Sequence, residues 1–203
     1  LPRLFEEMKT AIRMTTAIKA GLDGIGVDTW GVDFGLVGRG DPLLGTPVHY
    51  RDARTNGMLE AAFERIPKER IYEITGLQFL PFNTVYQLLA MKRANSPLLE
   101  VAETLLMMPD LFGWLLTGVK AGERTDSSTT QLLDPNTGAW SDEICRALEL
   151  PREILPPLIE PGSELGPLRK SVAEEVGVHH PLTVIAPPTH DTASAVAAGP
   201  TAS

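Results

Sequence analysis

The stretch that most constrains the fold of this chain is residues 187–196, which read Pro-Pro-Thr-His-Asp-Thr-Ala-Ser-Ala-Val. It follows an apolar run, residues 182–186, that is typical of a buried strand. It leads into small residues, 193–198, that favour the start of a helix. Asp191 therefore lies where a strand passes into a helix, and ligand sites in α/β sheets gather at such carboxyl ends of strands. Asp191 is therefore a candidate site residue.

Asp191 has two interpretations on this stretch alone. Its carboxylate can accept a proton from a bound hydroxyl group. It can also be a plain helix N-cap, since Asp is a favoured capping residue. Because caps are far commoner than general bases, the stretch by itself favours the cap.

A second informative stretch, residues 24–35, reads Gly-Ile-Gly-Val-Asp-Thr-Trp-Gly-Val-Asp-Phe-Gly. Its alternation predicts two short strands joined at 29–31. Its glycines allow a backbone or a ligand to come close. One interpretation is a glycine-rich hairpin with Trp30 in the core. The other places Trp30 and Gly31 in a pocket wall, with Asp28 and Asp33 nearby.

Apolar spacing and the positions of Gly and Pro predict most of the remaining elements. Turns are expected at 38–42 and 134–138, and a loop at 76–83. The proline-rich residues 151–167 are interpreted as a surface connector without regular structure. Helices are expected over 3–20, over 57–66 with Thr55 or Asn56 as cap, over 84–91 with Asn83 or Thr84 as cap, from Pro97, over 110–118, from Ser141, and over 168–176.

Charge and cysteine content exclude several classes of protein. The net charge is −8, the isoelectric point is about 5.0, and no basic cluster is present, which argues against a nucleic-acid or anionic-membrane partner. No apolar run reaches the length of a membrane span. The single cysteine, Cys145, excludes an internal disulfide and fits a reducing cytoplasm. It is interpreted as a small residue on the apolar face of a short helix.

Metal and nucleotide motifs are weak in this sequence. A zinc site can be imagined from His179, His180, His190 and Asp191, but the spacing matches no structural zinc pattern and no cysteine pair exists. A solvated pair of histidines, His179 and His180, before Pro181 is the plainer interpretation, so no metal site is predicted. A zinc hydrolase is kept only as a third alternative for the function. Neither a Walker-type loop nor a Gly-x-Gly-x-x-Gly after a strand is present, so ATP binding does not follow from these residues.

Several motifs, in the right order, resemble the rhamnulokinases, a group within the FGGY family of carbohydrate kinases. The resemblance runs from about residue 17 to 199. The Asp-Thr-Trp-Gly-Val-Asp-Phe and Gln-Phe-Leu-Pro-Phe-Asn-Thr sequences resemble this group rather than the wider family. The stretches that carry it are 24–35, 48–56, 76–84, 107–110 with 114–118, 125–132 and 187–196.

The resemblance implies an α/β, ribonuclease H-like (actin-like ATPase) domain with an inserted helical region between about 57 and 150, incomplete at both ends. Residues 1–203 would be part of the N-terminal, sugar-binding domain. The family's Asp-x-Gly phosphate loop would lie upstream of it, and the C-terminal nucleotide domain is absent from this stretch.

The implied activity of the whole protein is transfer of the γ-phosphate of ATP, with magnesium, to the 1-hydroxyl of L-rhamnulose in rhamnose catabolism. Residues 1–203 alone are expected to be inactive. The alternatives are another FGGY sugar kinase, acting on fuculose or xylulose, and a non-catalytic sugar-binding remnant. The nucleotide contacts and the oligomeric state are not predicted.

The resemblance also assigns roles to individual residues. Asp191 would be the catalytic carboxylate that takes the hydroxyl proton. His190 and Thr192 would orient the sugar through side-chain and backbone hydrogen bonds. Gly31 would let a sugar hydroxyl reach the backbone. Tyr50 falls where many relatives place a Trp beside the substrate, so it is a departure from the wider family and a candidate apolar wall.

Trp30, Asp33 and Asp52 complete the candidate sugar-binding set. Arg51 and Arg54 are not included in this set, because their side chains can instead form ion pairs with Asp52 and with neighbouring acidic residues.

Overall fold

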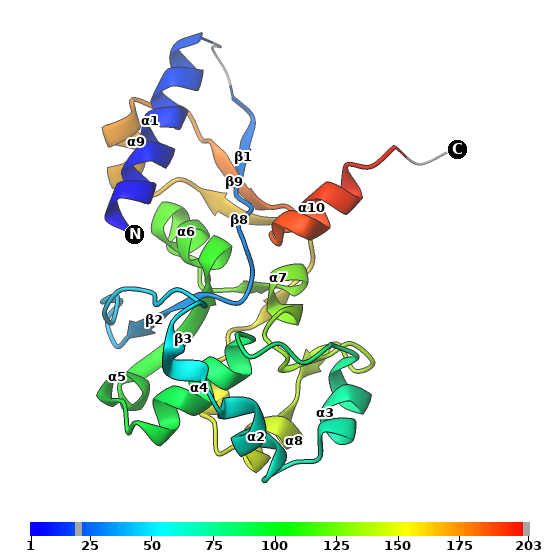
Figure 1. The fold of residues 1–203 in the computed structure, drawn as a ribbon. Helices are drawn as coiled ribbons and strands as arrows, with labels where there is room; N and C mark the ends of the chain where they lie inside the picture. Colours follow the sequence, from blue (N-terminus) through cyan, green and yellow to red (C-terminus); the bar gives the residue numbers. More distant parts are fainter. Residues whose placement is uncertain (19–21, 201–203) are drawn as a thin grey trace.

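The computed structural model describes residues 1–18 and 22–200. In Figure 1 the chain forms an upper part, built on a sheet, and a lower part built mostly from helices. The upper part contains α1 (Pro2–Ile18), α9 (Lys170–Val176) and the C-terminal helix α10 (Asp191–Ala197). Between the two parts lies α6 (Met108–Thr117). None of the helices in the described residues is both long and apolar enough to cross a bilayer.

The upper sheet has three strands in the order β1-β9-β8. β1 (Gly24–Gly26) runs parallel to β9 (Thr183–Ala186), and β8 (Ser163–Pro167) runs antiparallel to β9. Apolar residues of α1, α6, α9 and β9 form one core against this sheet. The buried members include Ile12, Leu116, Val172, Val176, Leu182 and Val184.

The glycine-rich strands do not form a hairpin, so that interpretation is wrong. β1 pairs with β9, whereas β2 (Phe34–Gly38) pairs antiparallel with β3 (Ala102–Met107) in another sheet. The backbone after β1 continues beside β9, because the Thr29 N–H donates to the Thr189 carbonyl at 2.9 Å. Val32 then takes a positive φ of 66°, which an L-residue rarely adopts and which redirects the chain into β2.

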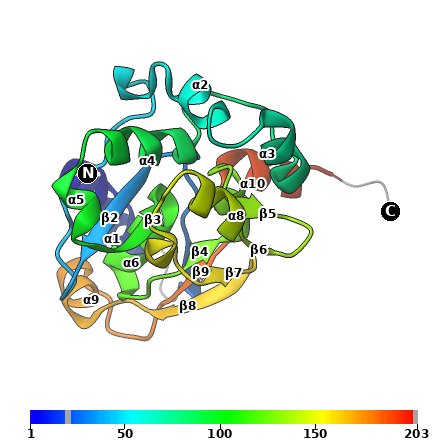
Figure 2. The same cartoon turned by 90° about the horizontal axis from the view of Figure 1, so that it is seen from below.

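The lower part packs its helices against the β2–β3 pair. Seen from below, α4 lies between α2 and these strands (Figure 2). The largest fully buried side chains of this core include Tyr86, Leu88, Leu105, Ile144 and Leu148. The elements are α2 (Met58–Phe63), α3 (Lys68–Thr75), α4 (Thr84–Arg93), α5 (Pro97–Glu100), α8 (Asp142–Ala147), β5 (Leu133–Asp134) and β6 (Ala139–Trp140).

Helix boundaries with a strong local signal are confirmed. α6 ends at Gly118, which takes a left-handed φ of 93°. α8 begins after Ser141, whose side chain accepts from the Ile144 N–H. The helix expected over 57–66 is shorter, and its N-cap is Gly57 without a side-chain bond. Thr55 instead belongs to a 3-10 turn, η1 (Ala53–Thr55).

The proline-rich segment 151–167 is regular where a connector was expected. It holds η2 (Arg152–Ile154), β7 (Leu158–Ile159) and the edge strand β8. β7 pairs in parallel with β4 (Gly122–Glu123). Pro is tolerated here because an edge strand leaves some N–H groups unpaired and because prolines precede β7 rather than interrupt it.

Candidate functional site

A pocket of about 320 Å³ opens beside the start of α10. Four distant segments form its wall: the chain after β1, the loop before α4, the end of α7 (Arg124–Ser128), and the turn after β9. Tyr50 adds a side chain from a fifth segment. The lining residues are Trp30, Gly31, Val32, Tyr50, Leu77, Gln78, Leu80, Phe82, Asn83, Thr129, His190 and Asp191.

Asp191 is the first residue of α10, and its carboxylate is exposed at the pocket. The N-cap position belongs to His190, and no side-chain capping bond is made there. The plain N-cap interpretation of Asp191 is therefore wrong. Oδ1 accepts from the Thr192 N–H at 2.6 Å, and His190 Nε2 lies 3.5 Å from the same oxygen. In the described part of the chain Oδ2 has no hydrogen-bond donor, so it is available to a ligand.

Thr29 fixes the backbone of this turn from the side of β1. Its N–H donates to Thr189 O at 2.9 Å, and its carbonyl accepts from the Asp191 N–H at 2.8 Å. Through these two bonds Thr29 and His190 form a parallel bridge, which extends the β1–β9 pairing past the end of β9. The turn therefore carries Asp191 and His190 to the same sheet edge as Trp30.

Gly31 is held against Thr129 from α7. A Cβ at position 31 would lie 2.7 Å from Thr129 Cγ2, closer than real Cβ contacts. Thr129 Oγ1 accepts from the N–H of Val32, the residue after Gly31, at 3.0 Å, and this bond fixes the rotamer of the Thr129 side chain. The absence of a side chain at position 31 thus allows the two segments to approach each other at the pocket wall.

Replacing Gly31 by Ala should destabilise the protein by about 1–3 kcal/mol, because Thr129 must move and weaken its bond to Val32. Thermal unfolding should show a fall in Tm of about 2–4 °C per kcal/mol. Gly26→Ala is the matched control, because its added Cβ meets Pro187 at an ordinary 3.4 Å. Equal Tm values for the two variants would contradict this account.

Trp30 is oriented by Asp33, which is only 2% exposed. The indole Nε1–H donates to Asp33 Oδ2 at 2.8 Å, and burial raises the pKa of the Asp33 carboxyl. Asp33 lies behind Trp30 and outside the pocket lining. Its position suits support of the indole rather than contact with a ligand.

Asp52 and Thr192 also lie outside the pocket lining. Asp52 caps η1 through the Arg54 N–H, and Thr192 donates its N–H to Asp191. The alternative in which Arg51 and Arg54 form ion pairs with Asp52 is not seen among the described residues. Arg54 instead donates to Gln87 Oε1 at 2.6 Å, and Arg51 lies over the Tyr50 ring.

Tyr50 and Phe82 form an aromatic wall of the pocket. Their ring centroids lie 5.2 Å apart, and Tyr50 stacks on His49 at 4.4 Å. Leu77 and Leu80 extend this apolar surface. One pocket therefore offers both a carboxylate and an apolar wall.

Sequence reasoning missed the polar residues that hold the pocket together. Asn83 Nδ2 donates to Thr129 O at 2.9 Å. The buried Gln87 amide donates to Val32 O at 3.0 Å and to Phe82 O at 2.9 Å. A signal did exist, because Gln87 is a polar residue inside the apolar part of α4 and such residues, when buried, need partners.

The histidines of the imagined zinc site lie apart. His179 and His180 precede β9, whereas His190 and Asp191 follow it, so the strand separates the two pairs. That grouping is wrong. In residues 1–18 and 22–200, no three His, Cys, Asp or Glu side chains are arranged to hold a metal ion.

Three buried carboxyl groups lie behind the turn. Asp110, Glu123 and Asp126 come from α6, β4 and α7 and are almost fully excluded from solvent. Burial raises the pKa of Asp110 and of Asp126 well above the ordinary value, and repulsion by neighbouring carboxylates, including Glu123, adds to both shifts. Both groups therefore favour the protonated, neutral form.

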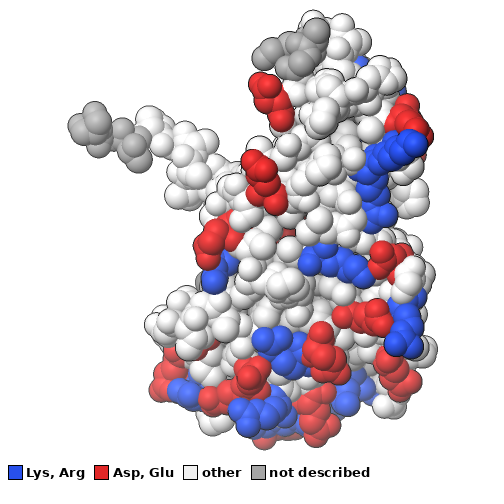
Figure 3. Space-filling model, turned by 180° about the vertical axis from the view of Figure 1, so that it is seen from behind, with Lys and Arg blue, Asp and Glu red and all other residues white. Residues whose placement is uncertain are grey.

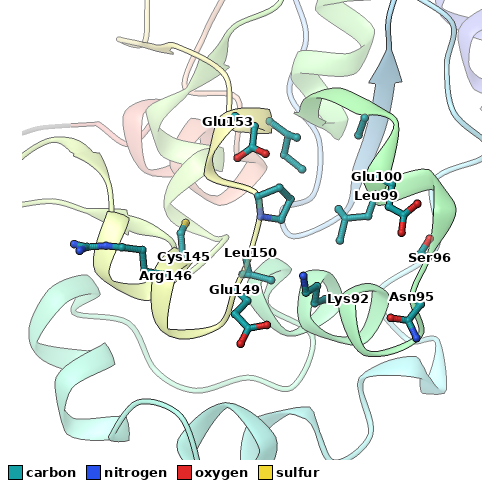
Figure 4. Close-up of a pocket in the computed structure, with 13 residues that line it drawn as sticks. Lys92, Asn95, Ser96, Leu99, Glu100, Cys145, Arg146, Glu149, Leu150 and Glu153 are labelled. Carbon is teal, nitrogen blue, oxygen red and sulfur yellow. The ribbon is translucent and has the colours of Figure 1, made fainter.

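A larger hollow, of about 560 Å³, lies between α5 and the segment from α8 to η2 (Figure 4). Its charged side chains, among them Lys92, Arg146 and Glu153, are exposed. Exposed, flexible charges orient a ligand poorly, so the pocket beside Asp191 is the stronger candidate. Figure 3 shows basic and acidic side chains interspersed over the lower part of the opposite face.

A carboxylate after a parallel strand pair and an aromatic wall line one pocket, and such an arrangement is typical of small-molecule sites in α/β proteins. The sequence pattern of the FGGY family of carbohydrate kinases, N-terminal domain, matches residues 3–198. The chain belongs to this family, and the expected fold is confirmed.

Named relatives agree with this assignment. The chain is 43% identical over 199 residues to a rhamnulokinase of Halalkalibacterium halodurans, covering 97% of this chain and 42% of the relative. It is 43% identical over 202 residues to a rhamnulokinase of Oceanobacillus iheyensis, covering 98% and 42%. The chain thus spans about two fifths of the length of these relatives.

Solved structures share the fold. A gluconate kinase and a ligand-bound xylulose kinase, both from Lactobacillus acidophilus, each superpose with a TM-score of 0.83 at 22% identity. Each match covers 92% of this chain and 38% of the solved chain. At this identity the likeness concerns the fold.

Proposed function

We propose that the whole protein transfers the γ-phosphate of ATP to the 1-hydroxyl of L-rhamnulose, in the cytoplasm. The observation that carries this proposal is that one pocket is lined both by a carboxylate, at Asp191, and by an apolar wall, at Tyr50 and Phe82. L-rhamnulose is a 6-deoxy sugar, with reacting hydroxyls at one end and a methyl group at the other. The rhamnulokinase relatives support the same substrate.

In this mechanism the 1-hydroxyl oxygen forms a bond to the γ-phosphorus, the bond from that phosphorus to ADP breaks, and the hydroxyl proton passes to Asp191. The exposed Oδ2 of Asp191 would accept it. His190 and the backbone at Gly31 would orient the other hydroxyls. Tyr50 and Phe82 would pack against the methyl end of the sugar.

Magnesium neutralises phosphate charge in kinases. The described residues hold no cluster of three metal-ligating side chains, and Asp191 is the single carboxylate among the residues that line the pocket. These residues do not by themselves form a magnesium site. The proposed roles are therefore limited to sugar binding and to the proton.

Substrate comparison tests the proposal. The full-length gene product should show kcat/KM for L-rhamnulose about 10–100-fold above that for L-fructose, its 6-hydroxy counterpart, because an apolar wall rejects an added hydroxyl only moderately. A coupled ADP-release assay measures both values. Preference for L-fuculose or D-xylulose would replace the proposed sugar, and no ketose-dependent turnover would reject the kinase proposal.

Tyr50→Ala should raise KM for L-rhamnulose about 10-fold and narrow the discrimination against L-fructose, because the variant removes one side of the apolar wall. Tyr50→Phe is the matched control, because it keeps the ring and its contact with Phe82. If Tyr50→Phe lost as much as Tyr50→Ala, the phenol hydroxyl rather than the apolar wall would be the determinant.

A further inference from the structure

The carboxylate of Glu123 lies beneath the turn that carries Asp191, and no part of this side chain is exposed. Glu123 ends β4, which pairs in parallel with β7, and it is the N-cap of α7. Strand pairing on one side and a helix start on the other hold its backbone in place. Its side chain points toward the end of β9, as its contacts show.

All the hydrogen bonds to this carboxylate come from two threonines. Oε2 accepts from the Thr189 N–H at 2.9 Å, from Thr189 Oγ1 at 2.8 Å and from Thr125 Oγ1. Oε1 accepts from the Thr125 N–H at 2.9 Å. Thr125 Oγ1 accepts in turn from the His190 N–H at 3.2 Å. The carboxylate is thus connected to the two residues that precede Asp191.

The turn is held on its other side by Thr29, through Thr189 O and the Asp191 N–H. Ser194 Oγ, one helical turn further along α10, donates to Pro188 O at 2.6 Å. Thr189 is therefore bonded through its N–H, its hydroxyl and its carbonyl. Such complete bonding fixes the direction in which α10 starts and hence the place of the Asp191 side chain.

Burying a carboxylate is costly unless its bonds are complete, and a well-packed apolar residue often serves stability equally well. Glu123 makes no ion pair in the described structure, and its bonds converge on the turn. The contacts therefore indicate a role in the geometry of the turn.

We propose that Glu123 is a positioning residue, which acts through Thr189 and Thr125 to hold Asp191 against the sugar hydroxyl. This inference rests on the proposed kinase function, because Asp191 matters only if a hydroxyl group is deprotonated there. Misplacement of a catalytic group by about 1 Å can cost about 10²-fold in rate.

The central test is Glu123→Gln in the full-length gene product. The amide keeps the shape of the side chain but replaces one carboxylate oxygen by an NH2 group. That group cannot accept the Thr125 N–H at the Oε1 position or the Thr189 N–H at the Oε2 position, so one side of the network is lost in either orientation. We expect kcat to fall about 10–100-fold. KM for L-rhamnulose should change less than about 3-fold, since Tyr50 and Gly31 belong to other segments.

Three comparisons separate positioning from simple destabilisation. Asp126→Asn alters a buried neighbour of Glu123 that gives the turn no side-chain hydrogen bond among the described residues, and it replaces a carboxyl group that favours the neutral form by a neutral amide, so kcat should stay within about 2-fold. Ser141→Ala removes a helix cap in the lower part and lowers stability without reaching the turn. Thr189→Ser, which keeps both donors, should retain the kcat that Thr189→Val loses.

Amide hydrogen exchange gives a readout that does not depend on activity. In Glu123→Gln the amides of Thr189 and His190 should exchange faster than in the wild type, while those of α4 should not change. Unchanged exchange, or a loss of kcat no larger than in Ser141→Ala, would overturn the positioning role. A wild type without ketose-dependent turnover would refute the proposed kinase function, and the exchange data would still decide whether Glu123 holds the turn.

Discussion

Replacing Asp191 by Asn in the full-length gene product is expected to lower kcat for L-rhamnulose by about 10²–10⁴-fold, the usual contribution of a general base. The amide keeps the size of the side chain and can still accept through Oδ1 from the Thr192 N–H. It cannot take the hydroxyl proton. Steady-state kinetics with ADP-release detection measure the loss, and KM should change far less than kcat.

Asp23→Asn is the control for this experiment, because Asp23 is an exposed carboxylate before β1, at the opposite end of the strand from the pocket. It should leave kcat unchanged. Near-normal turnover in Asp191→Asn would show that another group accepts the proton.

The second large effect concerns stability. Asp126 is fully buried, and neither of its oxygens has a hydrogen-bond partner in the described structure. Burial raises its pKa, so the folded state holds a proton that the unfolded chain releases. The free energy of unfolding should therefore fall as pH rises from the ordinary Asp value to the raised one, by up to about 1.4 kcal/mol per pH unit. Asp126→Asn should remove this contribution to the pH dependence of the free energy of unfolding.

Urea unfolding at pH 4.5, 6.0 and 7.5 tests this prediction. The stability of the variant relative to the wild type should increase with pH. Asp134 is a control of opposite sign, because the Asn136 N–H lowers its pKa in the folded state. The contribution of Asp134 to the free energy of unfolding is present above the ordinary Asp pKa and is lost as pH falls. Parallel pH profiles for the wild type and Asp126→Asn would show that Asp126 is charged when buried.

Local signals in the sequence predicted the parts of the fold that local interactions determine. The strand-turn-helix at Asp191, the end of α6 at Gly118 and the start of α8 after Ser141 each depend on neighbouring residues. The pairing of β1 was not predictable in the same way. An alternating strand does not specify its partner, and β9 is distant in sequence.

The pocket shows the same difference between residues that the sequence indicates and residues whose role depends on long-range contacts. Trp30, Gly31, Tyr50 and His190 all line it, as the family resemblance suggested, although their roles toward a sugar stay predictions. The supporting residues were not anticipated. Thr129, Gln87 and Glu123 act by bonding backbone groups from other segments, and such contacts exist only after the chain has folded.

The bridge between Thr29 and His190 also affects the order of events during synthesis. One half of the pocket wall is made near the start of the chain, while Asp191 is among the last described residues to leave the ribosome. Closing so long a loop is slow relative to local helix formation. The helical lower part can therefore form first, and a nascent chain gains both halves of this pocket wall only when β9 joins β1.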